Sequence, residues 1–135
     1  MDSPPRAEPV RLFLVTQSEG FGRSVARYVG DNPRIALTGV APSLALAGML
    51  LSATRSDVVL FDWSVFSGSL GDAVRDLRLA CPGLRIVCVA YEAAALRTTA
   101  SRAGIDAVIS RDELADGLDS LLRGLFPERF GAGPA

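Results

Sequence analysis

The 135-residue sequence contains no histidine and no lysine, so its 14 basic residues are all arginine. These two absences exclude Schiff-base lysines, histidine general bases, histidine metal ligands and Ser-His-Asp triads. The formal net charge is −1, which leaves no basic field of the kind that binds nucleic acid. We therefore expect a protein that is not an enzyme, carries no cofactor or metal, and does not itself bind nucleic acid.

Cysteine is scarce, and long apolar runs are absent. Cys81 and Cys88 are the only two cysteines, too few for a zinc site or a disulfide framework. We expect both to be buried thiols that act as small hydrophobic residues, with a redox pair as the alternative. No apolar run reaches the ~18–20 residues that a membrane span needs, and the N-terminus does not read as a secretory signal. These features predict a cytoplasmic protein without a membrane segment.

Hydrophobic periodicity predicts one domain over residues 10–125, after a disordered lead-in (1–9) and before a flexible tail or linker (126–135). The expected strands are residues 10–15, 35–40, 57–62, 84–90 and 107–109. The expected helices are residues 20–29, a helix that begins at Ser43, and residues 72–80, 93–102 and 112–125. This alternation, with continuous apolar strands, indicates an α/β fold with a parallel sheet covered on both faces.

Local signals refine two of these helices. Ser43 is a suitable N-cap for the second helix, whose buried stripe is expected to contain Leu44, Ala47, Met49 and Leu51. Gly104 follows the fourth helix and is suited to a left-handed C-cap. In a parallel sheet of this kind, the functional crevice lies beyond the carboxyl ends of the strands. One of those ends is Asp62, which closes the third strand.

Four segments carry a family resemblance through their order and spacing: residues 31–35, 56–63, 82–87 and 103–112. With an aspartate at the end of the third of five strands, the chain resembles the receiver domain of bacterial response regulators. It is most similar to receivers of the helix-turn-helix transcription-factor branch. The resemblance implies a doubly wound, flavodoxin-like (βα)5 domain with strand order 2-1-3-4-5. It also places the family's phosphoacceptor on Asp62.

The other motif positions of the family fall on residues of different chemistry. The acidic pair falls on Thr16 and Gln17, the Thr or Ser on Ala90, the aromatic switch on Val108, and the Lys on Arg111. Mg²⁺ favours carboxylate ligands, and only Asp62 supplies one, unless Glu19 reaches back toward it. We expect a degenerate pocket in which Asp62 forms a partly buried pair with the planar fork of Arg111.

These departures suggest a pseudo-receiver in a two-component or phosphorelay pathway, acting as a protein-interaction module without Mg²⁺-dependent phosphorylation. Its partner would be a kinase, an output protein or a second copy in a homodimer. The expected surface is formed by the fourth helix, fifth strand and fifth helix, on or near which lie Tyr91, Glu92, Arg97, Arg111 and Asp112. Trp63 and Phe66 are either interface anchors or a cover for the pocket.

Two other hypotheses stay open at this point. One is a working receiver, phosphorylated on Asp62 by a histidine kinase and belonging to a longer DNA-binding regulator. The other is a small-molecule or redox sensor that uses the crevice or Cys88. The sequence leaves both a stand-alone protein and a piece of a longer regulator open.

Overall fold

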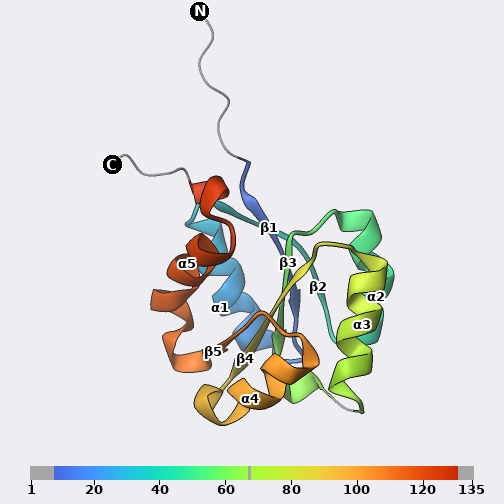
Figure 1. Cartoon of the computed structure of the whole chain (residues 1–135). Helices are drawn as coiled ribbons and strands as arrows, with labels where there is room; N and C mark the ends of the chain where they lie inside the picture. The colour runs from blue at the N-terminus through green and yellow to red at the C-terminus, as the bar shows by residue number, and fades with distance from the viewer. Residues whose placement is uncertain (1–7, 67, 131–135) are drawn as a thin grey trace, which may run out of the picture.

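The computed structural model describes residues 8–66 and 68–130, which form a parallel sheet with helices on both faces (Figure 1). The sheet has five strands in the order β2-β1-β3-β4-β5, which confirms the predicted fold class. The strands are β1 (Val10–Val15), β2 (Ile35–Ala41), β3 (Val58–Asp62), β4 (Arg85–Ala90) and β5 (Ala107–Ser110). Residues 1–7 of the predicted lead-in and 131–135 of the predicted tail lie outside the described residues.

The helices follow the predicted alternation. The α-helices are α1 (Glu19–Gly30), α2 (Leu44–Thr54), α3 (Leu70–Ala80), α4 (Ala93–Ala103) and α5 (Leu114–Leu125). Short 3-10 helices are η1 (Trp63–Val65), η2 (Arg111–Glu113) and η3 (Pro127–Phe130). The N-caps of α1, α2 and α3 are serines whose side chains each accept a backbone hydrogen bond, which confirms Ser43 in this role. Gly104 ends α4 with φ +91°, as predicted for a left-handed C-cap. No helix in the described part of the chain is long and apolar enough to cross a bilayer.

The core has two layers, one on each face of the sheet. Successive residues of β1 point to opposite faces, so Leu12 and Leu14 join the layer with α1 and α5, while Phe13 joins the layer with α2 and α3. Figure 1 shows α1 and α5 on one side of the sheet and α2 and α3 on the other. Because both faces are covered, the strands are apolar almost throughout, and β3 is buried over its whole length.

One predicted core residue is wrong. Met49 belongs to α2 but is 75% exposed, whereas Ala47 and Leu51 are fully buried. The helix contains no charged residue, so the sequence marks no outer face. Only the stripe through Ala47 and Leu51 reaches the sheet, and Met49 lies on the other side of the helix.

The pairing of β1 with β2 is irregular next to Phe13. The register shifts between Leu12 and Phe13, and Phe13 pairs with Gly39. A Cβ atom on Gly39 would lie only 2.7 Å from Cε2 of the Phe13 ring. Glycine is therefore required here by the close approach of a buried ring to the neighbouring strand.

Candidate functional site

The carboxyl ends of the strands gather the predicted site residues at one edge of the sheet. Thr16 follows β1, Asp62 closes β3, Ala90 closes β4, and Arg111 follows β5. Parallel strands put these ends side by side, and β3 lies between β1 and β4. The structure thus brings together most of the residues that the family resemblance selects.

Asp62 is buried and already has partners for its carboxylate. The residue is 5% exposed. Its Oδ2 accepts a hydrogen bond from Thr16 Oγ1 at 3.3 Å, and its Oδ1 accepts one from the Ser64 backbone N–H at 3.2 Å. Nη1 of Arg111 lies 3.7 Å from Oδ2. A buried carboxylate needs such partners, because leaving it unpaired would be costly.

The planar fork of Arg111 was expected to pair with Asp62. In the structure, the guanidinium does not bind the carboxylate bidentately. Its nearest approach, 3.7 Å, is longer than a charge-assisted hydrogen bond. Instead, Cζ of Arg111 lies 4.3 Å from the ring centroid of Phe21 and 5.1 Å from that of Tyr91. Both distances suit a cation over an aromatic face. The guanidinium of Arg111 is therefore closer to a cation–aromatic arrangement than to a hydrogen-bonded pair with the carboxylate.

The other predicted positions make their contacts with residues other than Asp62. Gln17 is exposed, and its Nε2 donates to the Pro42 carbonyl at 3.2 Å. Glu19 opens α1 with a side chain that is 91% exposed and lies 4.0 Å from Arg23. Val108 is half-buried and packs in the layer with α2 and α3. Among the described residues, no three Asp, Glu, Cys or His side chains gather closely enough to hold a metal ion.

A pocket of about 400 Å³ opens beside Asp62. Apart from Asp62, it is lined by Trp63, Ser64, Ala90, Tyr91, Glu92, Ala95, Leu96 and Arg111. Trp63 is half-buried, and its ring centroid lies 5.2 Å from that of Phe66, which is also half-buried. Trp63 forms part of the pocket wall, and Phe66 packs against the Trp63 ring without lining the pocket. The hydroxyl that the family resemblance expects on the fourth strand is replaced here by the methyl group of Ala90.

Cys88 lies within β4 and is fully buried. Burial, and secondarily the negative charge of Asp62, raise the pKa of this thiol to about 12. Burial and the Asp57 carboxylate also raise the pKa of Cys81. Both cysteines are free. Neither thiol is activated, because the thiolate is the reactive species and both environments disfavour it.

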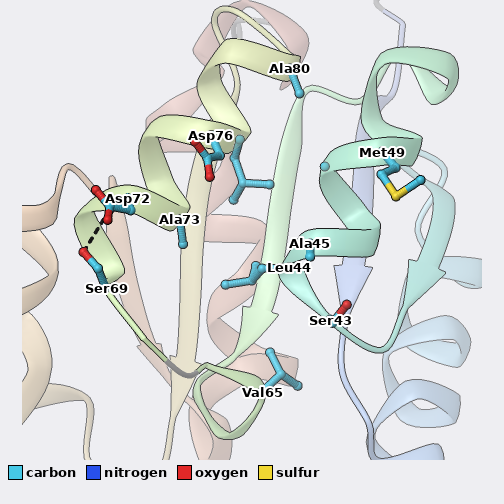
Figure 2. Close-up of a pocket in the computed structure, with 12 residues that line it drawn as sticks. Ser43, Leu44, Ala45, Met49, Val65, Ser69, Asp72, Ala73, Asp76 and Ala80 are labelled. Atoms are coloured by element: carbon cyan, nitrogen blue, oxygen red, sulfur yellow. Dashed lines mark hydrogen bonds between the residues drawn. The ribbon is translucent and has the colours of Figure 1, made fainter.

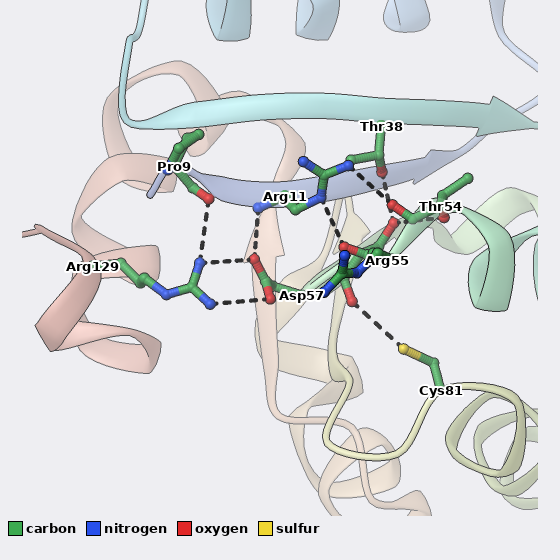
Figure 3. A network of polar contacts seen from close by, with 9 residues as sticks. Pro9, Arg11, Thr38, Thr54, Arg55, Asp57, Cys81 and Arg129 are labelled. Carbon is green, nitrogen blue, oxygen red and sulfur yellow. Dashed lines mark hydrogen bonds and ion pairs between the residues drawn. The ribbon is translucent and has the colours of Figure 1, made fainter. Parts of the chain in front are cut away.

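A second polar cluster lies at the opposite edge of the sheet, and sequence reasoning did not find it (Figure 3). Asp57, immediately before β3, accepts a hydrogen bond from the Arg11 backbone N–H at 2.9 Å. Arg129 of η3 donates to both carboxylate oxygens of Asp57, at 3.0 and 3.4 Å, and to the Pro9 carbonyl at 3.3 Å. Residues 126–130, expected to be part of a flexible tail, are thus attached to the sheet. No local sequence pattern indicates this contact, since Arg129 is 72 residues from Asp57 in the sequence.

Most of the residues named for the predicted interaction surface on α4, β5 and α5 are exposed. Tyr91 is 69% exposed, and Glu92, Arg97 and Asp112 are also exposed. α4 contains Arg97 and Arg102 and no acidic residue. This surface therefore offers an aromatic ring and several charges next to the pocket at Asp62.

Comparison with solved structures identifies the fold. The chain superimposes on a LuxR-family two-component response regulator from Aurantimonas sp. SI85-9A1 with a TM-score of 0.72 and 21% identity, covering 86% of each chain. The signal receiver domain of the putative response regulator NarL from Mycobacterium tuberculosis gives a TM-score of 0.73 at 19% identity, covering 93% of this chain and 99% of that one. A CheY-like receiver domain protein from Methanospirillum hungatei JF-1 gives 0.70 at 15% identity, covering 90% and 96%.

At these identities the comparisons establish the fold: the chain has the fold of response-regulator receiver domains. No protein-family model matches the sequence. No curated protein matches it either.

Proposed function

We propose that this chain is an atypical receiver that works in signal transduction by binding protein partners, without Mg²⁺-dependent phosphorylation of Asp62. The observation that carries the proposal is that the Asp62 carboxylate is buried and already has partners. Thr16 and Ser64 donate hydrogen bonds to it, Arg111 lies nearby, and the residue is only 5% exposed. A phosphoacceptor needs a free oxygen that faces the incoming phosphoryl group, with a metal ion beside it.

The donor set at this edge does not suit Mg²⁺. The ion favours oxygen ligands that include carboxylates, and Asp62 is the single carboxylate among the predicted motif positions. Thr16 offers a neutral hydroxyl that already donates to Asp62, and Gln17 points to the Pro42 carbonyl. Glu19, the one candidate for rescue, is exposed and close to Arg23. The site therefore does not fit Mg²⁺, and we propose that this chain signals without an enzymatic step of its own.

The parts that would transmit phosphorylation are also replaced. Ala90 has no hydroxyl to donate to a phosphoryl oxygen, and Val108 has no ring to change position. Arg111, which lies near the rings of Phe21 and Tyr91, instead places a positive charge 3.7 Å from the Asp62 carboxylate. We propose that Asp62 and Arg111 form a structural ion pair. Signalling would then depend on partner binding or on the amount of this protein in the cell.

For the partner, we propose a protein that docks on α4, β5 and α5, either a kinase, an output protein or a second copy of this chain. Exposed Tyr91 is a suitable anchor, because aromatic side chains contribute much of the binding energy at protein interfaces. Arg97 and Arg102 favour an acidic surface on that partner.

An amide NMR titration with Mg²⁺, followed by beryllofluoride, tests the proposal. The wild-type chain should show no clustered shifts at Thr16, Asp62 and Ala90 at millimolar Mg²⁺. The matched control is Thr16→Asp combined with Gln17→Asp, which restores the two missing carboxylates and should bind Mg²⁺ near Asp62. Clustered wild-type shifts that Asp62→Asn abolishes would refute the proposal.

A functional phosphoacceptor is the second candidate, and two observations favour it. Asp62 closes β3, where the family resemblance puts the phosphoacceptor, and the pocket of about 400 Å³ beside it leaves room for a small group. Under this alternative, acetyl phosphate would add one phosphoryl group to the wild-type chain and none to Asp62→Asn. Intact-mass measurement distinguishes the two outcomes directly.

A further inference from the structure

The surface of α2 is uncharged and mostly apolar, although much of the helix is exposed. None of its eleven residues carries a charge, and only Ala47 and Leu51 are buried. Met49 is 75% exposed, and Leu46 and Leu50 are 38% and 39% exposed. A surface helix normally presents a polar outer face, and a cluster of exposed apolar side chains marks a binding surface.

A groove of about 580 Å³ runs between α2 and α3 (Figure 2). Its apolar lining includes Leu44 and Met49 from α2, Leu77 from α3, and Val65 from the connection after β3. Gly48 also lines the groove, and a Cβ atom there would meet no heavy atom within 4 Å. The groove therefore has room for side chains from another molecule, which can approach the backbone of α2 closely at this glycine.

The two charged residues that line the groove are both acidic. Asp72 and Asp76 of α3 line it, and the described residues that line it include no arginine. Asp72 forms an exposed ion pair with Arg75 at 2.9 Å. Asp76 is exposed and lies one helical turn further along α3, on the same side of the groove (Figure 2). A partner that fits this groove would combine an apolar face with a basic flank.

We propose that the groove between α2 and α3 binds an amphipathic α-helix of a partner protein. Its apolar side chains, spaced i, i+3 and i+4, would enter between Met49 and Leu77, and its Lys or Arg residues would face Asp72 and Asp76. A second copy of this chain fits less well, because its apolar helix α2 brings no cation to the two aspartates. The groove contains none of the residues around Asp62, so this inference is independent of the proposed function.

Two synthetic helices test the charge preference. The first is a peptide of about 18 residues, roughly five helical turns, with leucine on one face and lysine on the flanks. The second keeps the leucines and replaces every lysine with glutamate. The lysine peptide should bind the full chain and shift the backbone amides of Gly48, Met49 and Asp76. The glutamate peptide should bind at least about tenfold more weakly, since its charges face two carboxylates.

Variants of the chain locate the binding. Asp72→Asn combined with Asp76→Asn should weaken the lysine peptide about three- to tenfold, the range for two exposed ion pairs. Asp116→Asn, an exposed carboxylate on α5, is the matched control and should leave the affinity unchanged. Gly48→Leu fills the groove and should reduce binding further. Circular dichroism of each variant checks that it is folded.

Three results would overturn the inference. The first is equal binding of the two peptides, or no binding of either. The second is a set of amide shifts outside α2 and α3. The third is concentration-dependent dimerisation of the chain alone, measured by sedimentation and abolished by Met49→Glu, because this would assign the groove to a second copy.

Discussion

Replacing Arg111 with methionine removes the only cation within 4 Å of the buried Asp62 carboxylate in the described part of the chain, while it retains most of the apolar stem. The change also ends the contacts of the guanidinium with Phe21 and Tyr91. Asp62 keeps its two hydrogen bonds from Thr16 and Ser64. We expect a folded but less stable protein, because a nearly buried charge loses its counter-ion.

The size of this effect follows from the geometry. At an effective dielectric constant near 20, two charges about 4 Å apart attract by about 4 kcal/mol. The Arg111 side chain is 22% exposed and 3.7 Å from Asp62 without a hydrogen bond, so we reduce this attraction to about 1–2 kcal/mol for solvent screening. The two aromatic contacts add about 1 kcal/mol. The variant should therefore lose about 2–3 kcal/mol of unfolding free energy, or roughly 6–12 °C in Tm.

A double-mutant cycle separates the ion pair from the aromatic contacts. Asp62→Asn, Arg111→Met and the double variant are unfolded with urea, and the coupling free energy is calculated from the four values. We expect a coupling of about 1–2 kcal/mol. A coupling below about 0.5 kcal/mol, or a more stable Arg111→Met variant, would show that the cation does not stabilise Asp62.

Three further predictions concern other parts of the molecule. Gly39→Ala should cost about 1–3 kcal/mol in urea unfolding, because the new methyl group would lie 2.7 Å from the Phe13 ring. Cys88 should resist iodoacetamide in the native protein at pH 8, where burial keeps its pKa at about 12, and should react once the chain is unfolded. The pKa of Asp119 is lowered, first by the hydrogen bond from Arg123, so this carboxylate stabilises the fold above its unfolded pKa and loses that contribution as the pH falls through its folded pKa. Asp119→Asn should thus lower the unfolding free energy near pH 7 by less than about 1 kcal/mol, and the difference should disappear as the solution is acidified.

Each of these has an internal control. Gly48→Ala, in the middle of α2 with open space around its Cβ, should stabilise the protein by about 0.5–1 kcal/mol. If both glycine variants have the same effect, the Phe13 contact is not the cause. Cys81 is half-buried and serves as the reference thiol. Native labelling of Cys88 as fast as Cys81 would contradict its burial. An unchanged difference between wild type and Asp119→Asn from pH 7 to pH 2 would contradict the role of its charge.

The architecture was predictable from the amino-acid sequence. Apolar strand segments that alternate with amphipathic helices predicted the parallel sheet, and the strand order expected from the family resemblance is confirmed. Caps such as Ser43 and Gly104 were also predictable, because they depend on side-chain and backbone chemistry within a few residues. The position of Asp62 at the end of β3 follows from the same local pattern.

Which helix faces are buried, and which charges meet, depends on how the elements pack together. α2 has no charged residue, so its sequence marks no outer side, and packing against the sheet leaves Met49 exposed. Arg111 was predicted beside Asp62, but its orientation depends on the Phe21 and Tyr91 rings, which come from different elements. Arg129 of η3 and Asp57, immediately before β3, likewise meet only when the elements pack together. Periodicity describes neighbours along one element, whereas these contacts join residues that become neighbours only when the elements pack together.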